Sequence, residues 1–588
     1  MIPVMPMSQK LVFYVLCFLA GLLCSRWVLS RSARKIAKWA KGLRTSSGSL
    51  SPSPEAGILQ PICEEILQWA LWLKETRAAA EEEARLRLKG ANRWTPDRLK
   101  EHVRIILRGR PFLVVANREP YTHVRENGKI KCVRPASGLV TAVEPILRAC
   151  GGTWIASASG DADKETADEH GRIKVPPENP VYALRRIWLS EQEEEGYYYG
   201  FSNEGLWPLC HIAHTRPVFR AGDWEQYRRV NQRYAEVVAE ELEGMKNPFV
   251  LIQDYHFALL PQMIRKLRPD AKIALFWHIP WSNPESFAIC PWAKEILQGM
   301  LGADLIGFHI QFHCNNFLDT VDRLLESRID SEQFAVDRKG HRTGVRPFPI
   351  GIATGAEEDR DPKKTIATAR EEVMKRLGLD AQCILGVGVD RIDYTKGISE
   401  RFRAIERFLE KHPEFREKFT FVELAAPSRT LIKRYSDLGD ELNRDAEEIN
   451  RRFQTRTWKP IIFRKEHHNQ EEVDLFYRAA NLCLVTSLHD GMNLVGKEFV
   501  WSRADEQGVL ILSRFAGASR QLRDALLVNP YDIEEVADAI HQAATMPSDE
   551  QKARMVRMRA ILDEHNVYRW AADIITELDR IRPDTARV

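Results

Sequence analysis

Two cations lie close together in the segment VDRIDYTKGI, residues 389–398, which follows an apolar run typical of a buried strand. Arg391 and Lys396 stand at either end of a short turn in this segment. Two fixed positive charges that converge on one point suit a diphosphate, whose negative charge grows as the bond to it breaks. A surface pair balanced by Asp390 and Asp393 would have the same sequence, so this segment alone leaves both interpretations open.

A second candidate segment, HDGMNLVGKE at residues 489–498, follows the apolar run LCLVTS. Gly491 permits a tight turn, and the amides from Met492 onward begin a predicted helix, where free N–H groups suit phosphate or sugar hydroxyls. The carboxylate of Asp490 could accept hydrogen bonds from a sugar, and that of Glu498 from the two hydroxyls of a ribose. Each acid alone also fits a helix N-cap or an ordinary helix position.

The elements that must position these segments follow from an alternation of apolar runs with amphipathic stretches, which indicates parallel α/β layers. Strands are predicted at residues 112–116, 249–253, 273–277, 304–308, 384–389, 419–423, 461–464, 482–486 and 509–513, and a short helix at 96–107. A hinge near residues 351–364 separates a domain at 111–355 from one at 356–588. The predicted fold is α/β, with two Rossmann-like doubly wound domains that face one cleft (GT-B) and bind ligands beyond the strand ends.

Composition excludes several classes of protein. The chain of 588 residues is too long for one core, and 85 basic against 82 acidic side chains leave no general attraction to nucleic acid. The ten cysteines are scattered without zinc spacing, so no metal and no cofactor are expected.

The first residues differ from the rest of the chain. Residues 11–24 form an unbroken apolar run, and seven cations follow between Arg26 and Arg44. We expect residues 1–44 to be a membrane anchor with a basic flank, which keeps the catalytic domains in the cytoplasm. A cleaved signal peptide and a basic helix lying on the lipid surface are the alternatives. A linker at 45–57 and a helical extension at 58–110 complete the N-terminal part.

The two candidate segments, in this order and at this separation, resemble the donor-site motifs of the trehalose-6-phosphate synthase family, which are retaining glycosyltransferases of family 20. Six further segments resemble that family: VVANREP, YYYGFSNEGLWP, LIQDYHFALLP, FWHIPWSNPESF, DLIGFH and FPIGI. The resemblance covers residues 111–544.

On the donor side, the resemblance implies that Arg391 and Lys396 grip the diphosphate of UDP-glucose, and that Asp490 holds the glucose. His278 matches a histidine close to the transferred sugar. The remaining donor positions are Ser137 and Gly138 of the loop after the first strand, His468 near the uracil, and the run Gly491, Met492, Asn493, Leu494, Val495, Gly496, Lys497 and Glu498.

On the acceptor side, the resemblance implies that Arg118 and Arg429 bind the phosphate of glucose 6-phosphate. Tyr198, Trp207 and Asp254 match further acceptor contacts, and Trp154 occupies a family tryptophan position. The chain departs from the family after Trp154, where a second tryptophan is replaced by the run IASASG. This segment faces the acceptor, so the resemblance supports the donor class more strongly than the identity of the acceptor.

The resemblance therefore implies transfer of glucose from UDP-glucose to glucose 6-phosphate, which forms trehalose 6-phosphate. No carboxylate stands out as a covalent nucleophile, and the family is described as using a front-face route in which the leaving diphosphate takes the acceptor proton. The alternatives are a sibling enzyme with another acceptor, such as glycerol 3-phosphate, and a non-catalytic membrane scaffold. The oligomeric state is left open, a homo-oligomer included.

Overall fold

A computed structural model describes residues 93–134, 138–354 and 366–581, together with residues 33, 35–39, 60, 63 and 66. The chain divides into two units, Met1–Asn92 and Arg93–Val588. Within the described residues, no helix combines the length and apolar character needed to cross a membrane. The apolar run at 11–24 and the linker at 45–57 lie outside these residues, as do most of the helical extension and of the predicted hinge.

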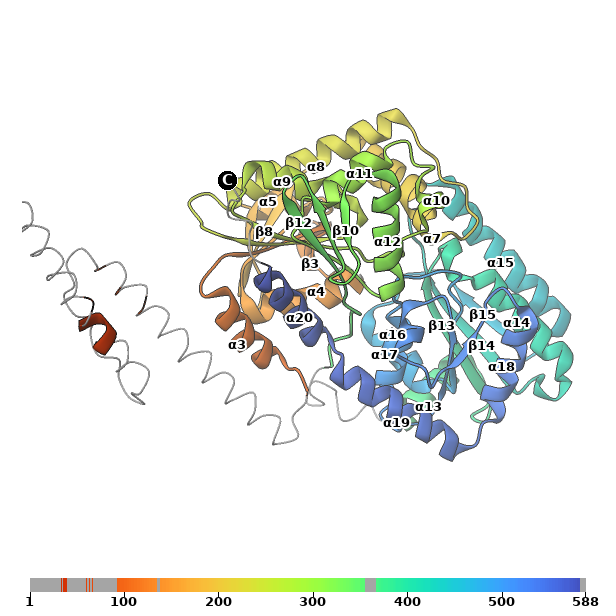
Figure 1. Cartoon of the computed structure of the whole chain (residues 1–588). Helices are drawn as coiled ribbons and strands as arrows, with labels where there is room; N and C mark the ends of the chain where they lie inside the picture. The colour runs from red at the N-terminus through yellow and green to blue at the C-terminus, as the bar shows by residue number, and fades with distance from the viewer. Residues whose placement is uncertain are drawn as a thin grey trace, which may run out of the picture. The chain divides into compact units, whose positions relative to one another are not determined.

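The first domain of the second unit is built on a ten-stranded sheet with a parallel centre (Figure 1). The strand order is β10-β11-β12-β9-β8-β7-β1-β4-β6-β5, and only the edge strands β5, β10 and β11 run antiparallel to their neighbours. The strands are β1 (Phe112–Arg118), β4 (Thr153–Ser157), β5 (Arg172–Val175), β6 (Tyr182–Ile187), β7 (Phe249–Gln253), β8 (Lys272–Phe276), β9 (Leu305–Phe308), β10 (Arg328–Asp330), β11 (Ala335–Arg338) and β12 (His341–Pro347).

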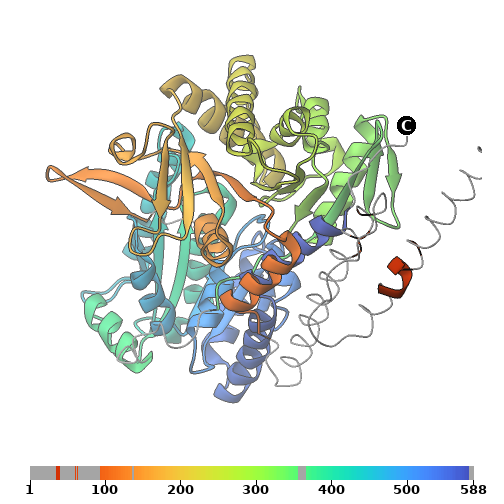
Figure 2. The same cartoon turned by 90° about the vertical axis from the view of Figure 1, so that its left-hand side faces the viewer.

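Helices surround this sheet, since its central strands are buried on both faces and carry continuous apolar runs such as FVLIQ in β7. A hairpin of β2 (Thr122–Glu126) and β3 (Lys129–Val133) projects beyond the sheet (Figure 2). The helices of this domain are α3 (Pro96–Leu107), α4 (Gly138–Cys150), α5 (Asp163–Thr166), α6 (Glu191–Glu194), the π-helix η2 (Glu195–Leu206), α7 (Trp207–His211), α8 (Ala221–Glu241), the 3₁₀ turn η3 (Tyr255–Phe257), α9 (Leu260–Leu267), α10 (Pro284–Phe287), α11 (Ala293–Met300) and α12 (Gln311–Leu324).

The second domain has a smaller sheet that is parallel throughout, with the order β15-β14-β13-β16-β17-β18. Its strands are β13 (Ile384–Arg391), β14 (Phe419–Ala426), β15 (Ile461–Arg464), β16 (Leu482–Val485), β17 (Val509–Ser513) and β18 (Leu526–Val528). The helices are α13 (Ile366–Leu377), α14 (Ile398–Lys411), α15 (Lys433–Phe453), α16 (Gln470–Ala479), α17 (Val495–Ser502), α18 (Ile533–Thr545) and α19 (Ser548–Glu564), with 3₁₀ turns η5 (Tyr394–Lys396), η6 (Pro413–Phe415) and η7 (Gly517–Arg520).

The last helix, α20 (Val567–Arg580), returns to the first domain and packs beside α3 (Figure 1). Arg110, just before β1, donates to the carboxylate of Asp579 at 2.8 Å, and Lys272 of β8 donates to the Asp579 carbonyl at 2.6 Å. The end of the chain thus ties the two domains together. The two parallel-sheet, Rossmann-like domains confirm the predicted α/β GT-B fold.

Candidate functional site

The candidate residues gather where parallel strands of both sheets end. Arg118 ends β1, Asp254 directly follows β7, and Arg391 ends β13. His278 follows β8, Arg429 follows β14 and Asp490 follows β16. The carboxyl ends of parallel strands are where α/β folds bind ligands.

Lys396 and Asp490 form the tightest charged contact of the site, with Nζ 2.5 Å from Oδ2. Ser487 and Asn493 also donate to the same carboxylate oxygen, each at 3.3 Å. Burial opposes ionisation of Asp490, but Lys396 outweighs burial and holds its pKa well below the usual range. The ion pair of Lys396 with Asp490 therefore joins the two sequence segments. The Lys396 side chain is still partly exposed, so an anionic ligand can also contact it.

Behind this pair, Arg401 of α14 holds the ends of several strands in place. Its guanidinium is fully buried and lies 2.6 Å from Glu423 and 2.7 Å from Asp390. Its Nε also donates to Thr486 Oγ1 at 2.9 Å. Because Asp390 precedes Arg391 and Thr486 precedes the 489–498 segment, Arg401 positions both candidate segments.

The turn at Gly491 lies directly against the first domain. A Cβ at this position would stand 2.0 Å from the carbonyl oxygen of His278, so only glycine fits. In the described part of the chain, the amides of Met492, Asn493 and Leu494 donate no hydrogen bond, whereas the amide of Gly496 donates to Asn493 Oδ1. The turn therefore offers free N–H groups just before α17, as an anion or sugar hydroxyl would require.

The two charged residues at the start of α17 differ in what they contact. Glu498 receives a hydrogen bond from the Tyr477 hydroxyl at 3.3 Å, and burial raises its pKa to about 7. Lys497 is fully buried instead, and its Nζ donates at 2.6 Å both to the Ile350 carbonyl and to Gln521. The sequence predicted that Lys497 binds the donor. Its side chain instead contacts Ile350, in the segment that leads out of the first domain.

Trp207 of the first domain lies close to two arginines of the second domain. The Cζ of Arg429 is 3.9 Å from the ring centroid, and that of Arg391 is 5.6 Å away. Arg429 also pairs with Asp393 at 2.9 Å, within the first candidate segment. No described residue forms an ion pair with Arg391, so this guanidinium is available to an anionic ligand.

Arg118 and Tyr198 form the outer part of the acceptor side. Arg118 is exposed and donates to the Tyr198 hydroxyl at 3.1 Å. Burial alone would raise the pKa of Tyr198, but Arg118 and Arg429 outweigh it and lower the pKa to about 8. Tyr198 lies in the π-helix η2, a rare geometry that often marks functional sites.

His278 and Asp254 lie together under the Gly491 turn. The His278 amide donates to Asp254 Oδ1 at 3.1 Å, and its Nε2 is 2.7 Å from Gln253 Oε1. Burial lowers the pKa of His278 to about 3 and raises that of Asp254 to about 7. The backbone of Asp254 also has a positive φ of 75°, which is a strained conformation for any residue other than glycine. His278 is therefore neutral, fixed in position, and 3.1 Å or less from both partners.

The structure does not bring four of the predicted residues into this cluster. Trp154 is fully buried within β4, where it packs in the apolar core with Val114 and Val143, so it does not fit the expected acceptor contact. His468 has a nearly buried side chain whose Nδ1 lies 3.0 Å from Glu472. Ser137 lies outside the described residues, while Gly138 begins α4.

The structure adds residues that the sequence analysis missed. The Tyr255 hydroxyl donates to Asn203 Oδ1 at 2.8 Å and lies 3.5 Å from Arg429. The ring of His256 stacks on Tyr198 with 5.7 Å between centroids, and His489 contacts the His211 carbonyl at 2.6 Å. These residues could have been found from the segments LIQDYHFALLP and YYYGFSNEGLWP. Both segments are rich in polar aromatic residues, and the structure brings several of them together.

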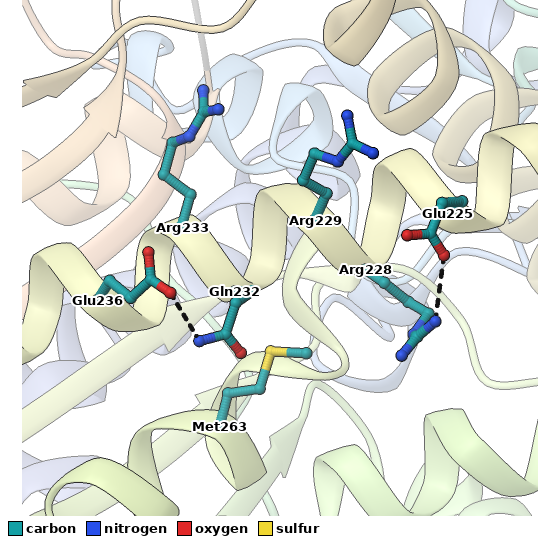
Figure 3. A pocket seen from close by; sticks show the side chains of 7 residues that line it. All are labelled: Glu225, Arg228, Arg229, Gln232, Arg233, Glu236 and Met263. Atoms are coloured by element: carbon teal, nitrogen blue, oxygen red, sulfur yellow. Dashed lines mark hydrogen bonds and ion pairs between the residues drawn. The ribbon is translucent and has the colours of Figure 1, made fainter.

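A surface groove lies elsewhere, on the outer face of α8, with a volume of about 370 Å³ (Figure 3). Arg228 is hydrogen-bonded to Glu225 and Gln232 to Glu236 along the helix, and Met263 of α9 closes one side. None of the predicted site residues lines it. The groove is therefore separate from the cluster at the strand ends.

Comparison with known proteins agrees with this arrangement. The glycosyltransferase family 20 profile matches residues 110–580. The trehalose-6-phosphate synthase of Mycolicibacterium vanbaalenii is 38% identical over 488 residues, which cover 81% of this chain and 97% of that protein. The enzyme of that name from Mycobacterium tuberculosis is 36% identical over 480 residues, covering 80% and 95%.

Solved structures give the same result. The Escherichia coli trehalose-6-phosphate protein bound with UDP-2-fluoro glucose has a TM-score of 0.70 and 30% identity, covering 80% of this chain and 99% of its own. The UDP-forming α,α-trehalose-phosphate synthase of Burkholderia xenovorans, in complex with glucose 6-phosphate, has a TM-score of 0.69 and 31% identity, covering 79% and 99%. The fold, the matched length and these relatives show that the chain belongs to glycosyltransferase family 20.

Proposed function

We propose that this chain transfers glucose from UDP-glucose to glucose 6-phosphate and forms α,α-trehalose 6-phosphate and UDP. The relatives reported above carry the name of this activity, and two of the related structures hold a UDP-glucose analogue or glucose 6-phosphate. The observation that carries the proposal is the arrangement of Arg391 and Arg429 against Trp207, beside the pair of Lys396 and Asp490.

In this proposal the donor diphosphate binds to Arg391 and Lys396. Arg391 has no acidic partner among the described residues, and Lys396 has one, Asp490, whose carboxylate is also near the donor sugar. As the glycosidic bond breaks, the diphosphate gains charge, and the two cations stabilise that charge more strongly than they stabilise the bound substrate. The free amides after Gly491 supply further donors, and Glu498 accepts from the ribose.

The acceptor binds on the other side of Trp207, with its phosphate at Arg118 and Arg429. Both cations are already held, one by the Tyr198 hydroxyl and one by Asp393, so the phosphate meets a preformed site. Tyr198, Trp207 and Asp254 contact the sugar, and the acceptor hydroxyl then attacks on the face from which the diphosphate leaves. The diphosphate takes the acceptor proton, and the protein contributes orientation and charge.

A neutral His278 suits this route. With its pKa near 3 it cannot act as an acid at neutral pH, but a neutral ring can still hydrogen-bond a sugar hydroxyl. The Gln253 contact holds the ring, and the carbonyl of His278 packs against Gly491. His278 therefore links the donor turn with the acceptor side.

A sibling activity with a smaller acceptor such as glycerol 3-phosphate remains the second candidate. The observation that favours it is the small-residue run after Trp154, in which Ser157 contacts Tyr234 and Ser159 donates to Glu119. Incubation with a panel of nucleotide sugars and phosphorylated acceptors, followed by mass spectrometry, separates the two. The mass of a disaccharide phosphate supports the proposal, and product from glycerol 3-phosphate alone contradicts it.

We also propose that residues 11–29 anchor the enzyme, with its catalytic domains in the cytoplasm where nucleotide sugars are made. Seven cations between Arg26 and Arg44 oppose translocation of the chain that follows them. Deletion of residues 1–57 should release the protein from membranes while kcat stays within about twofold of the full chain, because no site residue lies in that segment. A deletion variant that still sediments with membranes, or that cannot turn over, contradicts this proposal.

A further inference from the structure

A cluster of imidazoles and a carboxylate lies on the second domain, away from the site described above. His412, Glu414 and His541 each place one ligand atom so that all three lie within 4.8 Å of one another. His412 caps the C-terminal end of α14, Glu414 lies in the next turn η6, and His541 is on α18. The fold thus brings together two histidines that are far apart in the sequence.

Aromatic neighbours hold the two imidazoles in place. The rings of His412 and His541 stack with centroids 3.8 Å apart and planes at 10°. Phe415 meets the His541 ring edge-on at 5.7 Å, and Phe408 lies 5.7 Å from His412. Packing therefore keeps the two rings next to each other, and binding one ion requires them to turn out of this stack.

The nitrogens of these rings have little else to bind. Within the described residues, neither ring takes part in a hydrogen bond, and the only carboxylate in contact with a ring nitrogen is that of Glu414, 3.5 Å from His412 Nδ1. Glu414 is exposed, with 61% of its side chain accessible, while His412 is 21% accessible. The cluster therefore offers unused lone pairs at the surface, where an ion can reach them.

We propose that His412, Glu414 and His541 form a binding site for a divalent transition-metal ion of the zinc class. Zinc lies about 2.0–2.1 Å from imidazole nitrogen and about 2.0–2.2 Å from carboxylate oxygen, so its ligand atoms lie roughly 3.3 Å apart in a tetrahedron. The ligand atoms, which now lie within 4.8 Å of one another, must therefore approach by about 1.5 Å. The stacked rings turn about χ2 to allow this, and the exposed Glu414 can follow. Three protein ligands leave a fourth position to water or to a further ligand.

The donor set selects the kind of ion. Two imidazoles and one carboxylate suit Zn²⁺, Ni²⁺, Co²⁺ or Cu²⁺, whereas Mg²⁺ and Ca²⁺ require mostly oxygen ligands. Neighbouring charges do not supply those oxygens, because Asp538 and Glu534 of α18 are already paired with Lys411. We therefore expect no competition from magnesium at this site.

The bound ion joins α14 to α18. Since α14 has 14 residues and lies between the turn that carries Lys396 and His412, about 21 Å of helix separate the ion from that turn. That distance excludes direct contact with the reacting atoms. The ion should stabilise the second domain, while turnover should be the same with and without a chelator.

The test uses the untagged full-length protein after treatment with a chelator. Zn²⁺ is titrated by calorimetry, and Co²⁺ serves as a probe because its visible absorption reports the ligands and their geometry. We expect one ion bound with a Tm that rises with ion concentration. His541→Ala and Glu414→Gln should each weaken binding at least about tenfold and change the Co²⁺ spectrum.

His170→Ala is the matched control, because His170 also lies 3.5 Å from a glutamate, Glu169, but belongs to no such cluster among the described residues. It should leave ion binding unchanged. Glu414→Gln alters an exposed side chain, so it tests the site even if His541→Ala does not fold. Absence of binding, or equal weakening in the control and in Glu414→Gln, overturns the proposal.

Discussion

The donor and acceptor sides of the site are held by different forces. On the donor side, Lys396 is paired with Asp490, and Arg401 behind them is paired with Asp390 and Glu423. On the acceptor side, one ion pair joins Arg429 to Asp393, and aromatic side chains add to it: the ring of Trp207 lies against Arg429, and the Tyr198 hydroxyl accepts from the exposed Arg118. Charge pairs fix where a leaving group is stabilised, whereas rings define the shape of a pocket. The donor side should therefore determine rate, and the acceptor side should determine which substrate is used.

The largest effect expected from this contrast is on stability. Arg401→Met removes one partner of a fully buried network and leaves Asp390 and Glu423 without their cation, which should cost about 3–5 kcal/mol of unfolding free energy. Arg407→Ala on the same helix is the control, because its pairs with Glu410 and Glu534 are solvent-exposed. Denaturant unfolding measures both, and equal effects would show that Arg401 does not hold the donor side.

The next effect is on the rate. Arg391→Ala or Lys396→Ala should lower kcat at least about 10²-fold, because each loses a contact to the charge that develops on the leaving diphosphate. Lys433→Ala, on an exposed α15 position, provides the control. Steady-state kinetics with UDP-glucose measures the loss. Near-normal kcat in both variants would remove the basis for the donor assignment.

On the acceptor side, a smaller and more selective effect is expected. Arg118→Ala should raise KM for the phosphorylated acceptor about tenfold, through loss of one charge-assisted hydrogen bond, while KM for the nucleotide sugar stays the same. Arg125→Ala, on the exposed β2–β3 hairpin, should change neither. Equal changes in the two KM values would show that Arg118 does not serve one substrate alone.

The smallest effect concerns pH. Burial raises the pKa of Glu498 to about 7 in the folded protein, above its usual value of 4.5. The stability this group contributes is full below pH 4.5 and is lost as the pH rises through 7, because the folded protein must then bury a charge. Glu498→Gln avoids that charge, although it still buries a polar amide, so the gain should be on the order of 1 kcal/mol at pH 8.

Thermal unfolding of Glu498→Gln and of the wild type at pH 5 and pH 8 measures this effect. The variant should gain relative to the wild type at pH 8 and bind UDP-glucose more weakly. Tyr477→Phe is the control, because it removes the hydroxyl that contacts Glu498 and keeps the carboxylate. A difference between variant and wild type that does not change with pH would contradict the raised pKa.

The same contrast explains what could be predicted from the sequence. The predicted strands at 249–253, 461–464 and 509–513 coincide with β7, β15 and β17, because each is a short apolar run between turns. Strands β4 and β6 and the antiparallel edge were not predicted, since charged residues interrupt the runs in β6 and in β10–β12. These segments form strands because they are buried against neighbouring strands. The spacing of apolar residues along the sequence does not reveal such contacts.

The donor residues were predictable because they lie in two continuous segments. Arg391 and Lys396 share a turn, and Asp490 and Gly491 share another. The acceptor side draws single residues from distant segments, such as Asn203 and His256, whose roles depend on the π-helix and on the strained backbone at Asp254. Lys497 was assigned to the donor by its place in the motif, but its side chain contacts Ile350. The role of such a residue depends on its neighbours in the fold, which its position in a motif does not show.

The most direct test of the central claim compares two acceptors under one donor. With UDP-glucose, kcat/KM should be much higher for glucose 6-phosphate than for glycerol 3-phosphate, and UDP should form in equal amount to the sugar product. Proton NMR of the product should show the transferred glucose in the α configuration, as retention requires, and the acceptor carbon also in the α configuration, as an α,α product requires. Efficient turnover of glycerol 3-phosphate with none of glucose 6-phosphate, or a product with an inverted anomeric centre, would contradict the account.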